Sequence, residues 1–343
     1  MKRVVLLSLL GAAFGGACAR AGDALVDLQA VNVADMLANV QGGLARRGAV
    51  LDKLDLIATY TGDDHGWPGV SAMVDLQATD AADFSGSVVG DAQAVSSIDA
   101  PAGVRVLDAW VAKDFDGRGG FKTGIIDLNT EFDVQQTAAL FLNGARGIGA
   151  DYSQSGDNGP SIFPSTGLGL VGWWLPFGHW QLKAGVFEDT PGDPNHPGRT
   201  DLSLSNDKGV LAAFEARYRP TPDVVIGAGS WTYSAGGQSG AYAIVDGALD
   251  ENFSAWLRAG AADGDIDATA GGGVVYTQDR AQLGVSFSTA HFRAGNAETS
   301  LEATFAYAFS DHLTVQPDLQ YVVAPSGEHD DALVLGLRVT AQL

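Results

Sequence analysis

The sequence predicts an all-β fold, a 16-stranded antiparallel transmembrane β-barrel. Three observations predict it. Hydrophobic residues make up 46% of the 343 positions, yet no uninterrupted apolar segment reaches the roughly 18 residues of a membrane-spanning helix. Apolar and polar residues instead alternate over stretches of about ten residues, the length of a tilted strand that crosses a bilayer. Short and long connections alternate between these stretches, as in bacterial outer-membrane barrels.

The first 21 residues have the features of a secretory signal peptide. Two cations precede an apolar run at 4–14, and small residues with two overlapping A-x-A sites follow, so the exact cleavage point stays open. We expect residues 1–21 to be removed and residues 22–343 to form one barrel domain. The single cysteine, Cys18, lies in the removed segment. The mature chain is therefore expected to have neither a disulfide nor a cysteine-based metal site.

The chain is strongly acidic. Its 20 Lys and Arg and 41 Asp and Glu give a formal net charge of −21 at pH 7. Removal of residues 1–21, which carry three cations and no acid, leaves 17 cations and 41 acids, a charge of −24. Such a surface repels nucleic acid, so we expect no nucleic-acid partner. A soluble acidic secreted protein would carry the same charge, and the charge alone does not exclude it.

The alternation is clearest at the C-terminal end of the chain. From Leu333 to the end, the odd-numbered residues are apolar, whereas Gly336, Arg338 and Thr340 stand between them. An apolar face on every strand has no partner layer in a soluble sheet but suits a lipid bilayer. An even number of strands also lets the sheet close without a free edge. The predicted strands are 37–44, 49–60, 70–79, 104–113, 119–128, 167–175, 179–188, 210–218, 224–233, 240–248, 253–261, 269–278, 281–290, 298–309, 313–323 and 332–343.

The connections sort by parity. After even-numbered strands they are mostly short, which predicts periplasmic turns, and after odd-numbered strands come the three longest, at 80–103, 129–166 and 189–209. The longest contains a helix-like stretch at 130–143. In 16-stranded barrels a long loop after the fifth strand folds into the lumen and narrows it, so analogy places a pore-constricting loop here.

Within this stretch, Phe132, Ala139 and Leu142 are spaced so that they could share one helix face. The stretch would begin beside Glu131 and Asp133, and carboxylates also stabilise a helix N-terminus. These two acids are therefore candidates either for helix capping or for contact with a solute.

Several longer segments occur in one order over nearly the whole mature chain. They are DMLANVQGGLARRGAVLDKLDL (35–56), HGWPG (65–69), GIIDLNTEFDV (124–134) with AALFLN (138–143), GPSIFP (159–164), and LTVQPDLQYVVAPSG (313–327) with ALVLGLRV (332–339). Together they resemble the carbohydrate-selective porin family, which is typified by OprB. The resemblance implies passive diffusion of glucose and related small sugars through a narrowed pore in the bacterial outer membrane. Arg105 matches a family arginine in position.

A sugar pore needs hydrogen-bonding groups that replace part of the hydration of hydroxyls, and charges of both signs at its narrowest point. Parity assigns several charges to the lumen, because a cation facing lipid at mid-bilayer would cost roughly 2 to 4 kcal/mol. Each of them could also do no more than solvate the wall. The candidate pore-lining or substrate-contacting residues are Arg105, Glu131, Phe132, Asp133, Lys183, Glu215, Arg217, Arg258, Glu302 and Arg338.

Other functions find less support in the sequence. No nucleophile, metal-protease or nucleotide-binding motif marks an enzyme, and we expect neither catalysis nor a cofactor. A membrane-embedded hydrolase and a general porin for small polar solutes are the alternatives. The acidic loop 263–267 lacks the downstream glutamate of a calcium site, so we expect a solvated extracellular loop and no metal. Expected partners are small sugars and outer-membrane lipid. A homotrimer is compatible with the fold, but no sequence feature specifies one.

Overall fold

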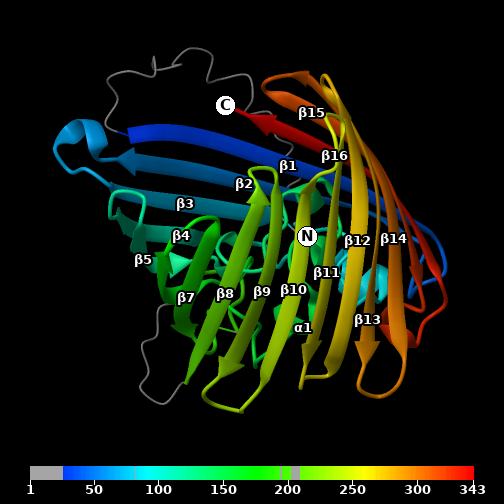
Figure 1. Cartoon of the computed structure of the whole chain (residues 1–343). Coiled ribbons are helices and arrows are strands. Elements are labelled where there is room, and N and C mark those ends of the chain that lie inside the picture. Colours follow the sequence, from blue (N-terminus) through cyan, green and yellow to red (C-terminus); the bar gives the residue numbers. More distant parts are fainter. Residues whose placement is uncertain (1–25, 81, 194, 202–208) are drawn as a thin grey trace.

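The computed structural model describes residues 26–80, 82–193, 195–201 and 209–343; the expected signal peptide at 1–21 lies outside these ranges. The described residues form one closed barrel of sixteen antiparallel strands (Figure 1). Each strand pairs with its neighbours in the sequence, and β1 (Val26–Gln41) pairs with β16 (Ala332–Gln342) to close the sheet. Closure leaves no row of unpaired backbone groups in contact with lipid. The predicted fold class is confirmed.

The other strands follow the chain in order around the barrel. They are β2 (Gly48–Thr61), β3 (Val70–Asp80), β4 (Gly103–Asp114), β5 (Gly119–Ile126), β6 (Gly167–Trp174), β7 (Trp180–Glu188), β8 (Val210–Thr221), β9 (Val224–Tyr233), β10 (Ser239–Ala248), β11 (Phe253–Ala262), β12 (Ile266–Gln278), β13 (Ala281–Phe292), β14 (Ala297–Ser310) and β15 (Leu313–Val323).

The helices are all short and lie in the connections. They are η2 (Asp63–His65), η3 (Ser85–Val89), η4 (Leu128–Thr130), η5 (Thr137–Leu140), η6 (Gly144–Arg146), α1 (Ala150–Ser153) and η7 (Pro325–Gly327). Within the described residues, no helix combines the length and the apolar character needed to span a membrane.

The two faces of the strands differ as period-two alternation predicts. On β14 and β16 the outward Phe305 and Leu335 are 41% and 47% exposed, whereas the inward Glu302 is 3% exposed. On β15 the inward Gln320 is fully buried. An apolar outer face and a polar inner face are what lipid outside and a polar lumen inside require.

The first strand is longer than predicted, because it begins at Val26 and not at position 37. Its pairing with β2 runs without a bulge, so one face carries Val31, Val33 and Asp35 while Asn32 lies on the other. The inward Val33 packs against a buried apolar cluster inside the barrel. The apolar residues therefore change face within one strand, and this hides the strand from a search for simple alternation.

Two connections fold into the barrel and fill part of it. The β5–β6 loop (127–166) buries Phe132 and Tyr152 among side chains of the barrel wall. The β3–β4 segment (82–102) buries Phe84 and Val88 in a cluster with Leu37. Entry of the first of these loops was expected from analogy; entry of the second was not.

The predicted helix over 130–143 is wrong. The chain there forms the separate short turns η4 and η5, and Asp133 between them has a φ of +57°, which ends any helix. Phe132 packs into one cluster with the barrel wall, whereas Ala139 is exposed, so the expected common face does not exist. The loop is shaped by its attachment points on the wall, which local periodicity does not encode.

Candidate functional site

Arg258 on β11 holds the β5–β6 loop by two carboxylates. Its Nε donates to Asp133 Oδ2 at 2.8 Å and its Nη1 donates to Asp151 Oδ1 at 2.7 Å. Thr269 on β12 donates to the same Asp151 oxygen. All three charged side chains are buried. Parity placed Arg258 inside the barrel correctly, but its guanidinium is used to bind the loop.

Glu302 on β14 provides a second attachment. Its carboxylate accepts from the backbone N–H of Leu142 at 2.5 Å and of Asn143 at 3.3 Å, and Arg146 lies 3.6 Å away. Arg146 donates in turn to Ser286 on β13. The side chains of Arg146 and Glu302 are both fully buried. The loop therefore supplies the cation that balances the charge of this wall carboxylate.

Glu215 on β8 forms a third attachment. It accepts from the backbone N–H of Asp133 at 3.0 Å, from the Tyr242 hydroxyl at 2.8 Å and from Arg217 Nε at 2.5 Å. Asp246 on β10 accepts from the backbone N–H of Gln136 at 2.6 Å. Wall carboxylates thus satisfy backbone donors of an irregular loop that lies away from water, which is the condition for such a loop at membrane depth.

The β3–β4 segment is attached in the same way. Glu298 on β14 accepts from the backbone N–H groups of Ala92 and Gln93, at 2.8 and 3.1 Å. Ser96 donates to Asp35 on β1 at 2.6 Å, and Asp35 is also the partner of Arg338, whose Nε and Nη2 both lie 2.7 Å from it.

Opposite these attachments, three charges form the lysine–glutamate cluster. Lys183 on β7 donates to Glu131 Oε2 at 2.7 Å, and Lys122 on β5 donates to the other carboxylate oxygen. Lys122 Nζ also lies 4.2 Å from the centre of the Trp110 ring, a cation–π distance. Burial disfavours the charged form of Glu131, but Lys183 and Lys122 outweigh burial and hold the pKa of Glu131 below its ordinary value. The carboxylate is therefore ionised in the lumen.

A polar row crosses β2, β3 and β4 beside this cluster. Lys53 donates to Asp55 at 2.5 Å, and Gln77 Nε2 donates to Asp55 at 2.8 Å. Gln77 lies directly opposite Arg105 in the β3–β4 register. Arg105 uses only Nη2, which donates to the Pro101 carbonyl at 2.7 Å and to a threonine hydroxyl.

This row contains buried polar atoms without a protein partner. Among the described residues, none bonds to Arg105 Nε or Nη1, to Gln77 Oε1 or to Asp75 Oδ1. A buried polar group without a partner costs free energy, typically about 1 to 3 kcal/mol, and sites that bind polar solutes are one reason to retain such groups. Arg105 and Gln77, which face each other in the register, thus keep two unpaired donors and one unpaired acceptor in the wall, all of them buried.

The structure therefore divides the sequence candidates into two sets. Asp133, Glu215, Arg217, Arg258 and Glu302 are buried attachments between loop and wall, and Phe132 packs in the apolar cluster behind them. The other candidates, placed in partly accessible or incompletely bonded positions, are Arg105, Glu131, Lys183 and Arg338.

Sequence reasoning missed several residues of the site. Lys53, Asp55, Gln77 and Lys122 lie on the inner face of the wall, and Asp35 binds Arg338. The same parity that assigned Glu302 would have placed Asp75, Gln77 and Thr79 in the lumen, because they alternate with apolar residues along β3. The partners on the inner loops had no such signal.

The acidic loop 263–267 uses its carboxylates locally. Asp263 accepts from the Ser239 backbone N–H and hydroxyl, and Asp267 lies 2.7 Å from His291 Nδ1. Within the part of the chain that the structure describes, no group of three or more His, Cys, Asp or Glu residues is arranged to hold a metal ion.

A closed 16-stranded barrel with an apolar outer face, a polar lumen and loops folded inside it defines a porin of the bacterial outer membrane. The family model described as carbohydrate-selective porin, OprB family, matches residues 53–288 and 270–343. The chain belongs to this family and is a carbohydrate-selective outer-membrane porin. The resemblance seen in the sequence is confirmed.

Solved structures share the fold. The high-pH structure of Pseudomonas putida OprB aligns with a TM-score of 0.83 at 16% identity and covers 93% of this chain and 94% of that chain. A variant of the Rh. blastica porin gives 0.62 at 13% identity, covering 93% and 100%. A loop-deletion variant of OmpT from Vibrio cholerae gives 0.58 at 12% identity, covering 93% and 99%. A search of curated proteins found no match.

Proposed function

We propose that glucose and related small neutral sugars cross the membrane between the β5–β6 loop and the wall formed by β2 to β4. On this path a sugar passes the lysine–glutamate cluster and the polar row of β2 to β4. The loop then acts as the pore constriction, because it is attached to β8, β10, β11 and β14 and, through Glu131, to β5 and β7, which leaves the polar row of β2 to β4 as the wall opposite it.

The observation that carries this proposal is the set of unpaired atoms around Arg105. Arg105 offers two donors, and Gln77 and Asp75 offer one acceptor each. A sugar hydroxyl is both a donor and an acceptor, so hydroxyls passing this wall can satisfy groups that the protein leaves open. Replacement of part of the lost hydration lowers the barrier to entry, while the small number of bonds allows the solute to leave.

Aromatic rings beside these charges fit the same path. Trp110 lies under Lys122, and the Phe163 ring centre lies 6.0 Å from Lys53 Nζ. A pyranose ring has apolar C–H faces as well as hydroxyl edges, so it can contact such rings while its hydroxyls bond to the neighbouring polar groups. A small anion gains nothing from an aromatic ring face, and the cation–π position on Trp110 is already taken by Lys122, so the combination of rings and polar groups favours sugars among small polar solutes.

The remaining properties of the protein follow from this function. Diffusion through a pore is passive, and we propose that the protein carries out no catalysis and needs no cofactor. Residues 1–21 would direct export and be removed, which leaves 22–343 as the barrel. The outer face would contact outer-membrane lipid. A homotrimer is the assembly we propose to test first, by crosslinking in native membranes.

A general porin for small polar solutes is the second candidate. The path carries charges of both signs, Lys53 and Lys183 on the wall and Glu131 on the loop, which would also suit ions and zwitterions. The two candidates differ in whether sugars interact with the wall or merely fit through it.

Liposome swelling and planar-bilayer conductance distinguish them. We expect glucose to reduce the current of the wild-type channel and Gln77→Leu and Arg105→Met to weaken this block several-fold, with a smaller effect on salt conductance. The control is Asp193→Asn, in the exposed β7–β8 connection. Equal block in the wild type and both variants would show that this wall does not recognise sugars.

A further inference from the structure

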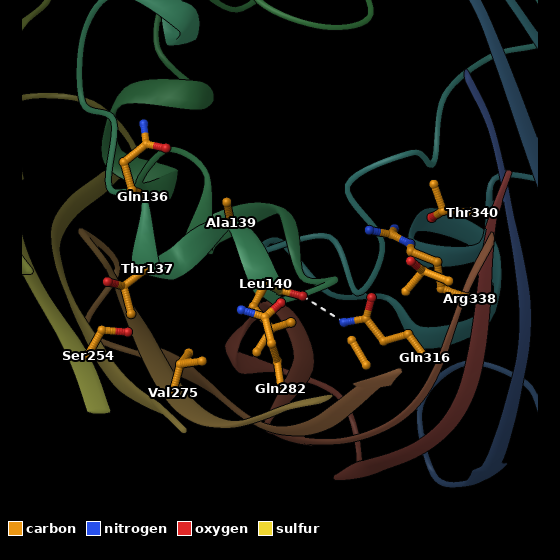
Figure 2. A pocket seen from close by; sticks show the side chains of 12 residues that line it. Gln136, Thr137, Ala139, Leu140, Ser254, Val275, Gln282, Gln316, Arg338 and Thr340 are labelled. Atoms are coloured by element: carbon orange, nitrogen blue, oxygen red, sulfur yellow. Dashed lines mark hydrogen bonds between the residues drawn. The ribbon is translucent and has the colours of Figure 1, made fainter. Parts of the chain in front are cut away.

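A second polar space lies inside the barrel below η5, toward the short turns. It is a cavity of about 500 Å³, within the roughly 300 to 1,000 Å³ of small-ligand sites. Ser254, Gln282 and Thr314 of its wall each follow a short turn by one or two residues, which places the cavity on the periplasmic side of η5. Figure 2 shows Gln316 and Arg338 on the same wall, with η5 beside them.

Gln316 and Arg338 are fixed in this wall and leave one polar atom each for a ligand. Gln316, which is 7% exposed, donates from Nε2 to the Leu140 carbonyl at 2.7 Å, so its Oε1 stays available as an acceptor. Arg338 gives Nε and Nη2 to Asp35, so Nη1 stays available as a donor. The two residues lie directly opposite each other in the β15–β16 register. A donor and an acceptor are therefore held side by side.

The rest of the lining suits a neutral, hydroxyl-rich solute. None of the described residues that line the cavity is acidic, and Asp35 neutralises the one cation, Arg338. Thr137 and Thr340 add hydroxyls, while Leu140 adds an apolar surface. An anion would find no uncompensated charge here, and a metal ion would find no carboxylate. The cavity thus differs from the lysine–glutamate cluster, where charges of both signs dominate.

We propose that this cavity is a second binding subsite for neutral sugars, in which Gln316 Oε1 accepts from one hydroxyl and Arg338 Nη1 donates to the adjacent hydroxyl of the same ring. The inference rests on the proposed sugar transport and adds a place where the solute rests after it has passed the β5–β6 loop. A sugar that arrives from the periplasm reaches this subsite without crossing the constriction.

Two variants test the subsite from different directions. Gln316→Met removes the acceptor but also the bond to Leu140. Ala139→Phe leaves that bond intact and fills the space from η5, where Ala139 is exposed. The matched control is Ala241→Phe, the same enlargement at an exposed position on the outer face of β10.

The measurement is the duration of single-channel block by glucose added to one side of a planar bilayer. For periplasmic glucose, Gln316→Met should shorten the block roughly fivefold, the effect of one lost hydrogen bond. Ala139→Phe should shorten it at least as much, because the larger side chain fills the cavity. The control should match the wild type, and gluconate should show no dependence on the cavity. If glucose still blocks from the outside and the duration of periplasmic block is unchanged in both variants, the proposed subsite is overturned. Absence of glucose block from either side of the wild type would overturn the proposed function as well.

Discussion

Arg258 and Asp133 form an ion pair, with 2.7 Å between Arg258 Nη2 and Asp133 Oδ2, in which the side chains are only 3% and 0% exposed. They lie 125 positions apart in the sequence. The pair connects the middle of the barrel wall to the β5–β6 loop, and Asp151 binds the same guanidinium. A charge buried in this way is stabilised by its partners. If the loop left the wall, Arg258 and the two aspartates would lose their ion pairs, which is costly for buried charges.

Loss of Arg258 should therefore release the loop. Arg258→Met leaves Asp133 and Asp151 without their cation, and removal of one partner of a buried pair costs about 3 to 5 kcal/mol. We expect a lower urea midpoint in detergent and a larger, noisier single-channel conductance. Arg280→Met is the control, because the Arg280–Asp311 pair is exposed and contributes little. Wild-type conductance in Arg258→Met would show that this ion pair does not hold the constriction.

The assignment of the outer face gives a second prediction. Leu335 and Phe305 are exposed on the outer face, so replacement of either by Arg should cost about 2 to 4 kcal/mol near mid-bilayer and impair assembly. Gln342→Arg, at the periplasmic end of β16, should be tolerated. Folding yield into vesicles, followed by the heat-modifiable shift on gels, measures the difference. Equal yields for the three variants would contradict the facing.

Period-two alternation was sufficient to predict the barrel, because each strand independently faces lipid on one side. The prediction failed near Val33, where the inner face packs against the β3–β4 segment and is apolar too. Where a folded loop covers the lumen face, that face is apolar at some positions, such as Val33, and carries buried charges at others, such as Glu302, so a polar lumen face is expected throughout only where water covers it.

The interior of the site was less predictable than the wall. Parity placed Glu302 inside, yet its partner is the backbone of Leu142, 160 positions away. Such contacts depend on how an irregular loop is laid across the lumen, and neither periodicity nor charge encodes that path. The same holds for Asp35, which becomes recognisable as a site residue only when Arg338 is seen opposite it.

The lysine–glutamate cluster predicts a pH dependence at the acidic end. Burial opposes ionisation of Glu131, but Lys183 and Lys122 hold its pKa below the ordinary 4.5. Because the pKa is lower in the folded than in the unfolded state, the ionised carboxylate stabilises the protein above about pH 4.5, and this contribution is lost as the pH falls through the folded-state value. The contribution of Glu131 to conductance and glucose block should therefore be constant down to about pH 4.5 and change below it.

The variant Glu131→Gln should show the acid form at every pH. It should have weaker glucose block at neutral pH and no further transition in the acidic range. The control is Asp250→Asn in an exposed turn, where the transition should remain as in the wild type. An acidic transition that persists in Glu131→Gln would assign it to another group.

Asp91 in the β3–β4 segment should have the opposite effect on stability from Glu131: its contribution should decrease as the pH rises. Burial, together with the charge of Glu298, raises the pKa of Asp91 to about 8, against the smaller opposite effect of a hydrogen bond with Ser85. The folded state therefore keeps a proton on Asp91 that the unfolded chain releases above about pH 3.8. The contribution of Asp91 to stability is largest below that pH and declines as the pH rises toward about 8, so the segment should loosen in mildly alkaline solution.

Replacement of Asp91 by Asn tests this. The amide stays neutral, so the decline in the urea midpoint between about pH 4 and about pH 8 should be smaller in Asp91→Asn than in the wild type. Proteolysis of the β3–β4 segment in the wild type should increase over the same range, since ionisation places a second negative charge beside Glu298. Asp330→Asn, exposed at the same end of the barrel, should keep the wild-type dependence. Parallel curves for Asp91→Asn and the wild type would contradict the prediction, because they would mean that the carboxyl of Asp91 is ionised and compensated throughout.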